Sequence, residues 1–368
     1  MTQEPKIFPY IERLLQGDEV VWKPLGEVAE LKRGTTITKK TSNEGIYPVI
    51  SGGQQPAYYI DRFNRDGETI TVAGSGAYAG FVMYWNEPIF VGDAFSIKAN
   101  EEQVLPRYIY HFLLSIQEKI HDLKSGGGVP HVYAKDVARF VIPLPPLSVQ
   151  QEIVRILDKF TQLEAELEAE LDCRKRQYEY YRSKLLTFNE IERGGTEIVW
   201  KTLGEVCINI FSGKNKDRND NASYPIYGST GIIGKTNKKA FSSKQILVAR
   251  VGANAGYVHI AEGEYDVSDN ALIIQHNGNI NLKFLYYILV NIKLNQYAKG
   301  GGQPLITARE LKSIIIPLPP LEEQQRIASI LDKFDTLVNS ISEGLPKEIA
   351  LRRKQYEYYR EKLLSFPS

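Results

Sequence analysis

Apolar residues recur at helical spacing in two segments of the chain. The steps between them are three or four residues, which is typical of a helix that buries one stripe against a partner. The first stripe runs from position 153 to 185 and the second from 327 to 363, with one additional step of four. The predicted packing positions are Ile153, Ile156, Phe160, Leu163, Leu167, Leu171, Tyr178, Tyr181 and Leu185, then Ile327, Ile330, Phe334, Leu337, Ile341, Leu345, Tyr356, Tyr359 and Leu363.

One-sided helices of this length are not expected to stand alone in water, because most helical stability comes from burying the apolar face. A globular segment lies between the two helices in sequence, so we predict that they pair in antiparallel orientation. Gly344 and Pro346 fall inside the second helical segment. Since proline removes a helical hydrogen bond, a kink or short break is expected there.

Short β-type runs alternate with Gly, Asn and Ser turns in the rest of the chain, roughly residues 20–147 and 198–321. The clearest runs lie at 47–50, 69–73, 224–227 and 245–249. Each segment also has a predicted helix, at 107–123 and 282–299, and then a Gly-Gly-Gly loop, at 126–128 and 300–302. The predicted fold class is α+β, with two similar mixed α/β domains.

Several strings occur twice. WKPLGEV at 22–28 returns as WKTLGEV at 200–206, IPLPPL at 142–147 returns at 316–321, and RKRQYEYYR at 174–182 returns as RRKQYEYYR at 352–360. We predict a pseudo-two-fold repeat with domain 1 at 1–147, spacer helix 1 at 148–190, domain 2 at 191–321 and spacer helix 2 at 322–368. Residues 1–20 form an N-terminal segment of domain 1, whose string at 8–13 resembles 188–193 and is expected to complete the C-terminal repeat.

Composition adds limits to this scheme. The hydrophobic share of 43% and the charged share of 24% are those of an ordinary globular protein. No apolar run has the length of a membrane span and no signal peptide is recognised, so a cytoplasmic protein without membrane contact is expected. The net charge of +1 argues against a purely electrostatic nucleic-acid binder but is compatible with a local basic face. Cys173 and Cys207 lack the spacing of a disulfide framework or zinc site.

The sequence offers no recognisable catalytic constellation. The glycines at 74–80 and 228–236 each miss a nucleotide-binding motif by one residue, and the histidines at 111, 121, 131, 259 and 276 are scattered. We therefore expect a non-catalytic chain without a metal or cofactor of its own.

Basic and hydrogen-bonding side chains occur at matching turn-rich places in both domains. Cations hold phosphates, whereas Asn, Gln and Arg read base edges, so we predict a surface for double-stranded DNA on each domain. A solvated basic surface without a ligand is the alternative for each residue. The candidates are Lys32, Arg33, Lys39, Lys40, Gln54, Gln55, Tyr58, Ser75 and Tyr78, and Lys214, Lys216, Arg218, Lys235, Lys238, Lys239, Arg250 and Asn254.

Two unlike readers in one chain predict a bipartite, asymmetric DNA target. Readers about one DNA turn apart (~34 Å) address one face of a duplex. The gap between the two parts of the target would then be set by the helices.

The ordered double set of strings resembles the specificity (S) subunit of type I restriction–modification enzymes over essentially the whole chain. The carrying residues are IPLPPL followed by QQEI at 150–153, its second copy followed by QQRI at 324–327, the tyrosine-rich helices and the duplicated WK-x-LGEV starts. The break at Gly344 and Pro346 departs from a smooth, equal pair of helices.

The resemblance implies two target-recognition domains separated by helices that act as a molecular ruler. It also implies assembly with two methyltransferase (M) subunits, which bind S-adenosylmethionine, and with restriction (R) subunits, which use ATP and magnesium. The S subunit is itself non-catalytic, and methylation in such enzymes is usually of adenine. Base-contacting residues vary with the target in this family, so the resemblance supplies none.

Three other interpretations stay open at this point. The chain could be the separate specificity subunit of a bipartite type II enzyme, which only its partner would distinguish. It could also be a two-headed coiled-coil scaffold or a carbohydrate-binding protein, which would have no affinity for DNA. An enzyme with an unrecognised site ranks last.

Overall fold

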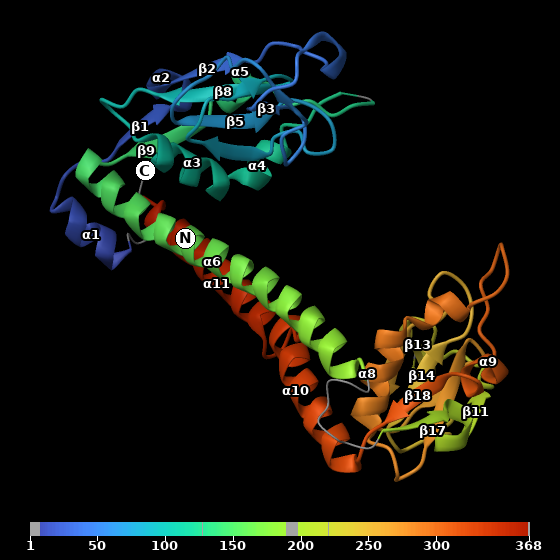
Figure 1. Ribbon diagram of the computed structural model, residues 1–368. Coiled ribbons are helices and arrows are strands. Elements are labelled where there is room, and N and C mark those ends of the chain that lie inside the picture. The colour runs from blue at the N-terminus through green and yellow to red at the C-terminus, as the bar shows by residue number, and fades with distance from the viewer. Residues whose placement is uncertain (1–7, 127, 189–197, 220, 367–368) are drawn as a thin grey trace. The chain divides into compact units, whose positions relative to one another are not determined.

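The computed structural model of the chain describes residues 8–126, 128–188, 198–219 and 221–366. The chain separates into two compact units, whose secondary structure is shown in Figure 1. Unit 1 comprises Met1–Glu168 and Ile349–Ser368, and unit 2 comprises Ala169–Glu348. Each unit combines one globular domain, domain 1 (residues 20–147) or domain 2 (198–321), with parts of the helical segments.

Domain 1 contains an antiparallel sheet, a smaller mixed sheet and a separate strand pair. The antiparallel sheet has the order β2 (Ala29–Arg33), β8 (Ala94–Ala99), β5 (Thr69–Ala73), β6 (Val82–Trp85). The mixed sheet has the order β4 (Tyr59–Ile60), β3 (Tyr47–Ile50), β7 (Phe90–Val91), and β1 (Val21–Pro24) pairs with β9 (Val141–Leu144). The helices of unit 1 are α1 (Pro9–Leu15), α2 (Leu25–Val28), α3 (Pro106–Ser115), α4 (Gln117–His121), α5 (Ala134–Val137), the 3₁₀ turn η1 (Lys39–Thr41) and nearly all of α11 (Leu345–Leu363).

Domain 2 repeats this topology. Its antiparallel sheet has the order β11 (Cys207–Ser212), β17 (Ala271–His276), β14 (Gln245–Ala249), β15 (Val258–Ala261), and its mixed sheet the order β13 (Gly231–Thr236), β12 (Tyr224–Gly228), β16 (Asp266–Val267). The pair β10 (Val199–Thr202) and β18 (Ile315–Leu318) matches β1 and β9. The helices of domain 2 are α7 (Leu203–Val206), α8 (Leu282–Ile292), the 3₁₀ turn η2 (Leu294–Tyr297) and α9 (Ala308–Lys312), and α10 (Leu321–Asn339) follows the domain.

The strand registers confirm the repeat at the level of single residues. Trp22 lies opposite Pro143, and Trp200 lies opposite Pro317. Strands β5 and β14 are buried along their whole length, as expected for the centre of a covered sheet. The predicted mixed α/β class with two similar domains is therefore correct.

Both helices predicted inside the domains are shorter than expected. In domain 1 the helix breaks at Ile116, because the Gln117 side chain donates to the Gly80 carbonyl at 2.7 Å and accepts from the Val82 amide at 3.2 Å. In domain 2 it ends at Lys293, whose left-handed backbone stops α8. Hydrophobic periodicity could not predict these helix ends, because one depends on hydrogen bonds of the Gln117 side chain and the other on the left-handed backbone of Lys293.

The helical segments differ in continuity. The first forms one helix, α6 (Leu147–Leu186), whose residues up to Glu168 belong to unit 1 and the rest to unit 2. The second is interrupted between α10 and α11, as Gly344 and Pro346 predict. A Cβ at Gly344 would lie 2.3 Å from the Thr336 carbonyl oxygen, so only glycine fits this turn. Pro346 follows in the first turn of α11, where proline costs no hydrogen bond.

In unit 1, α6 packs antiparallel to α11. The rings of Phe160 and Tyr359 stack with centroids 5.2 Å apart. Further along α6, Glu164 and Glu168 both accept hydrogen bonds from Arg353 at 2.5 Å. Buried apolar residues of both helices share one core with domain 1, including Ile153, Leu157, Tyr356 and Leu363. Leu157 lies one position away from the predicted stripe, because α6 also faces the domain.

In unit 2, the remaining part of α6 packs on α10. Tyr178 and Tyr181 stack on Phe334 with centroids 6.2 and 5.5 Å apart. The prediction is wrong at Ile341, which is 86% exposed in the break between α10 and α11. Leu337 is also exposed, and Val338 is buried in its place. The stripe shifts because α10 packs against both α6 and α8, so its buried face is wider than a coiled-coil seam.

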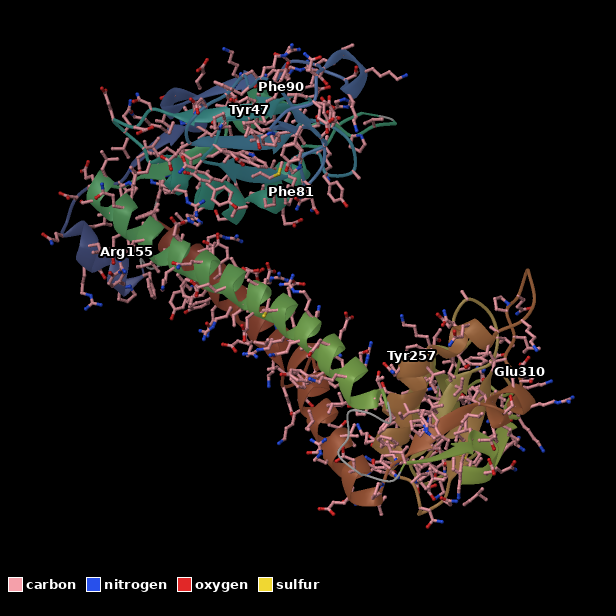
Figure 2. All side chains as sticks on the ribbon, in the orientation of Figure 1. Tyr47, Phe81, Phe90, Arg155, Tyr257 and Glu310 are labelled. Atoms are coloured by element: carbon pink, nitrogen blue, oxygen red, sulfur yellow. The ribbon has the colours of Figure 1, made fainter. Side chains whose placement is uncertain are left out.

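Helix α1 joins the core of unit 1. Its buried residues Ile11 and Leu15 belong to the same apolar cluster as Leu363, Leu364 and Phe366. Tyr10 also donates a hydrogen bond to Glu152 at 2.5 Å, and Glu152 accepts from Arg155, which is labelled in Figure 2. The start of the described chain and its end thus complete one core.

Candidate nucleic-acid interface

The loop at 214–219 in domain 2 is held by a buried asparagine. The side-chain amide of Asn215 donates to the Asp266 carboxylate at 2.6 Å and to the Thr236 hydroxyl at 3.3 Å. Its backbone amide donates to the Val267 carbonyl at 3.0 Å. These bonds hold Lys214 and Lys216 at the surface on either side of Asn215.

The anchored loop brings most of the predicted cations of domain 2 together. Lys235 lies on β13, and its carbonyl accepts from the Asn219 amide at 3.0 Å. Arg218 passes so close to Gly234 that its Cδ lies 2.9 Å from where a Cβ would stand. On the other side, Lys216 approaches the Asp269 carboxylate at 4.0 Å, and Arg250 donates to the Asp269 carbonyl at 3.3 Å. We call this surface the basic cluster of domain 2: Lys214, Lys216, Arg218, Lys235, Lys238 and Arg250.

Two further predicted cations are partly neutralised. Lys238 forms an ion pair with Asp217 at 2.8 Å, and Lys239 forms one with Glu264 at 2.6 Å. These hydrogen bonds raise the pKa of both ammonium groups. Lys239 pairs with Glu264 outside the basic cluster, and Asn254 is exposed in the turn after β14. Lys214 and Lys235 make no ion pair within the described residues, so they are the stronger candidates for contact with an anion.

In domain 1 the candidates fall into two groups. Lys39 and Tyr58 line a hollow of about 460 Å³ together with Asn43 and Tyr59, and the Tyr58 hydroxyl donates to the Ile37 carbonyl at 3.1 Å. Lys40 is exposed beside this hollow in η1, and Gln54 and Gln55 are exposed between β3 and β4.

The second group surrounds Asp93. The Ser75 hydroxyl donates to the Asp93 carboxylate, and Arg33 lines a small hollow beside the same carboxylate. Lys32 is exposed on β2, where its carbonyl accepts from the Ser96 hydroxyl at 3.1 Å. Tyr78 is exposed in the turn after β5.

Sequence reasoning missed the residues that hold these loops. Besides Asn215, they include Asn64, which exchanges two hydrogen bonds with the Val91 backbone at 3.0 and 2.7 Å. Asp93 and Asp269 were missed as well. The sequence does hold a signal for these two aspartates, because Val91-Gly92-Asp93 and Val267-Ser268-Asp269 occupy equivalent places at the ends of β7 and β16.

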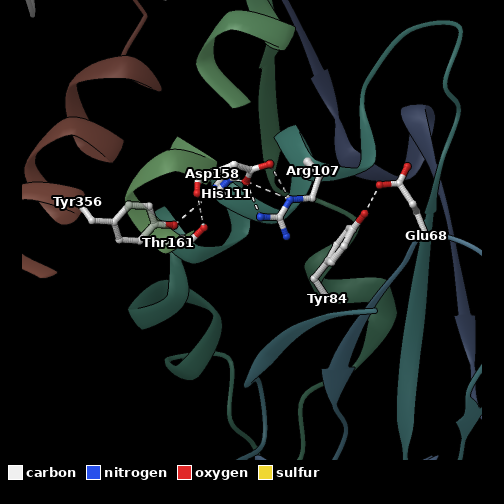
Figure 3. Close-up of polar contacts among 7 residues, drawn as sticks. All are labelled: Glu68, Tyr84, Arg107, His111, Asp158, Thr161 and Tyr356. Carbon is white, nitrogen blue, oxygen red and sulfur yellow. Dashed lines mark hydrogen bonds and ion pairs between the residues drawn. The ribbon is translucent and has the colours of Figure 1, made fainter. Parts of the chain in front are cut away.

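A polar junction fixes each domain to its helix. In unit 1, Asp158 on α6 accepts from Arg107 and His111 on α3, and the other nitrogen of His111 lies 2.9 Å from the Tyr356 hydroxyl of α11 (Figure 3). Burial lowers the pKa of His111. Burial opposes ionisation of Asp158, but hydrogen bonds from His111 and Arg107 outweigh it and lower its pKa.

Unit 2 has the equivalent junction. Asp332 on α10 accepts from Lys283 at 3.0 Å and from the Tyr287 hydroxyl at 2.6 Å, both on α8. The sequence holds a signal for both junctions, because the tetrapeptide Leu-Asp-Lys-Phe, which contains the aspartate, occurs at 157–160 and again at 331–334. These carboxylates are used in positioning the domains.

Membrane-spanning helices and metal-holding clusters of side chains are absent from the described residues. No helix in the described ranges is long and apolar enough to cross a membrane. Within the same residues, His, Cys, Asp and Glu side chains form no group of three or more that could hold a metal ion.

Comparison with known proteins places the chain among proteins of restriction–modification systems. The family model of the type I restriction modification DNA specificity domain matches residues 18–172 and again 197–351. The specificity subunit of the type I restriction enzymes EcoR124I and EcoR124II of Escherichia coli is 33% identical over 407 aligned residues, with 97% of each chain covered. A putative type I restriction enzyme specificity subunit of Haemophilus influenzae is 33% identical, covering 97% of this chain and 98% of its own.

Solved structures agree in fold. The S subunit of a type I restriction–modification system from M. genitalium aligns with a TM-score of 0.68 at 20% identity, covering 96% of this chain and 98% of its own. At 20% sequence identity, this structural similarity supports the fold alone. The two matches of the family model and the near-complete coverage by relatives decide the assignment: the chain belongs to the type I restriction modification DNA specificity family.

Proposed function

We propose that this chain is the specificity subunit that selects the DNA target of a type I restriction–modification complex. Domain 1 and domain 2, for which the sequence predicts the outer bounds 1–147 and 191–321, each bind one part of a bipartite, asymmetric double-stranded target. The observation that carries the proposal is the pairing of one duplicated fold with two different sets of basic loops. Identical domains would select identical half-sites, whereas these loops differ in sequence, length and anchoring.

The remaining functions belong to partner subunits in this proposal. Two methyltransferase subunits supply S-adenosylmethionine-dependent methylation, and restriction subunits supply ATP- and magnesium-dependent cleavage. The chain itself is non-catalytic and acts by holding DNA and partners together. The helices at 148–190 and 322–368 set the gap between the two half-sites, with α6 supporting this role as one uninterrupted helix of 40 residues.

The test is an exchange of domains. Replacing residues 20–147 by the corresponding domain of a relative is expected to change one half of the methylated motif and to leave the other half and the gap unchanged. The readout is sequencing of methylated DNA after co-expression with the methyltransferase partner. The reciprocal exchange of 198–321 serves as the matched control and is expected to change the other half. A change of both halves by a single exchange would contradict the proposal.

Neutralising the basic cluster of domain 2 tests the DNA-binding surface. We expect Lys214→Gln combined with Lys235→Gln to weaken DNA binding by the methyltransferase complex and to flatten its salt dependence by about 2 units of slope, since each phosphate contact contributes about 0.9. Fluorescence anisotropy at several salt concentrations measures both effects. Lys201→Gln with Lys347→Gln removes the same charge elsewhere and is expected to change neither. An unaltered slope in the first variant would remove both lysines from the interface.

A further inference from the structure

Each domain also has a glycine-rich segment whose two ends are paired by backbone hydrogen bonds. This segment lies outside the basic loops that we propose to read the bases. We call residues 125–126 with 128–131, and residues 299–305, the glycine fingers. In domain 1, Ser125 and His131 exchange two backbone hydrogen bonds at 3.0 and 2.8 Å. In domain 2, Lys299 and Leu305 do the same at 2.9 Å each. The finger of domain 2 is the orange hairpin that projects from its domain in Figure 1.

Each finger is fixed to the turn that follows the central strand of its own domain, β5 in domain 1 and β14 in domain 2. The Gly76 amide donates to the Pro130 carbonyl at 3.0 Å, and the Gly252 amide donates to the Pro304 carbonyl at 3.0 Å. A second bond joins Ile306 to the Arg250 carbonyl at 2.9 Å, and its equivalent joins Val132 to Gly74 at 3.0 Å. The fingers therefore stand beside candidate DNA residues, Arg250 in domain 2 and Ser75 in domain 1.

The glycines in the fingers divide into two kinds. Gly126 and Gly300 have φ of 112° and 107°, a conformation that disfavours side chains. Gly128, Gly301 and Gly302 have no such backbone, and a Cβ built on each meets nothing within 4 Å. The fold of the chain therefore does not require glycine at these three positions. Glycine costs conformational entropy on folding, so its presence at an exposed tip points to close approach of another molecule to the backbone.

The identity of that molecule follows from what the two half-sites share. The base-reading loops differ between the domains, whereas the Gly-Gly-Gly-x-Pro fingers and their anchoring are the same. The sugar–phosphate backbone is the part of a DNA target that does not change with sequence, and backbone N–H groups are common donors to its phosphates. A lysine stands at each finger: Lys124 donates to the Ala77 carbonyl at 3.3 Å, and Lys299 pairs with Glu310, labelled in Figure 2, at 2.9 Å.

We propose that the glycine fingers are two equivalent, sequence-independent contacts to the DNA backbone, one in each half-site. This inference rests on the proposed DNA-binding function. The basic loops select the bases, while the fingers hold each domain at a fixed distance from the strand. A side chain at Gly128, Gly301 or Gly302 would keep the finger's N–H groups away from the phosphates.

The test uses the full chain assembled with its methyltransferase partner. Gly302→Val and, separately, Gly128→Val are expected to weaken binding roughly tenfold, which corresponds to the loss of a hydrogen bond to a charged group. The loss is expected to be equal for a duplex that carries the target and for one that lacks it. Gly278→Val is the matched control, because Gly278 is equally open but lies at the far end of β17 from the fingers.

The outcomes separate this inference from the proposed function. If wild-type and Gly278→Val complexes bind DNA and the finger variants bind equally well, the fingers do not contact the backbone. If the finger variants no longer assemble with the methyltransferase, the fingers are a protein-docking element and the inference is overturned. A loss restricted to the target duplex would assign the fingers to base reading instead. If the wild-type complex binds no DNA at all, the proposed function itself fails.

Discussion

A chain that ends after Glu348 is expected to lose the fold of domain 1 while keeping that of unit 2. The missing residues include Tyr356, Leu363, Leu364 and Phe366, all buried in the core of domain 1. Burying one such side chain stabilises a fold by about 1.5 to 3 kcal/mol, so their removal costs roughly 6 to 12 kcal/mol. That loss is comparable to the whole stability of a typical domain, about 5 to 15 kcal/mol. The truncation also takes the Tyr356 hydroxyl away from His111.

Hydrogen–deuterium exchange measures this result strand by strand. Strands β5 and β8 should lose protection in the truncated chain, whereas β14 and β17 should retain it. Leu351→Ala with Tyr358→Ala is the control, because both side chains are about half exposed on α11 and their removal should change stability by no more than about 0.5 kcal/mol. Full protection of β5 and β8 without residues 349–368 would show that domain 1 has a sufficient core of its own.

Replacing His259 by methionine is expected to make unit 2 less sensitive to acid. The ring lies between Tyr227 and Tyr257, with centroids 5.8 Å from each, and neither ring nitrogen has a hydrogen-bond partner within the described residues. Burial lowers the pKa of His259 to about 4. The unfolded imidazole binds a proton near its ordinary value of 6.5, so between these values the unfolded state holds more protons. Stability therefore falls as pH decreases from about 7 towards 4.

Methionine has no titrating group, and its side chain is expected to fit at this position, because Met83 occupies the equivalent place on β6 of domain 1. Between pH 7.5 and 4.5 the variant should lose roughly 2 to 3 kcal/mol less stability in unit 2 than the wild type, since one unit of pKa difference corresponds to about 1.4 kcal/mol. Denaturant unfolding at both pH values measures the difference. An equal acid sensitivity in both proteins would show that His259 is protonated in the folded chain.

The sequence was most informative where the two repeats agree. The strings around Trp22 and Trp200 predicted an internal repeat, and the structure places both tryptophans in equivalent strand pairs. Gly344 with Pro346 predicted the break between α10 and α11. The stripe positions were accurate where a helix contacts one partner and failed at Ile341 and Leu337, where α10 turns a wider face to α8 and then ends. A heptad count assumes one straight seam and therefore cannot represent a helix with two partners.

The candidate interface was less accessible from sequence. Residue type alone suggested the cations, but it did not reveal that Asp217 and Glu264 pair with Lys238 and Lys239. It also missed Asn64, whose side chain bonds to the Val91 backbone as a strand partner would, and Asn215, whose side chain joins its loop to Asp266 and Thr236. Polar anchors of this kind depend on contacts between residues far apart in the chain, which no local pattern records.

The division of the chain between the units has a consequence for its synthesis. Unit 2 is one uninterrupted stretch, so it can fold as soon as residues 169–348 have left the ribosome. Unit 1 begins earlier but waits for residues 349–368 to fill its core. At about 5 to 20 residues per second, domain 1 therefore stays incomplete for roughly ten seconds or more while the intervening residues are made. The domain translated first is thus the last to mature, and during this interval its apolar surface is available to chaperones and proteases.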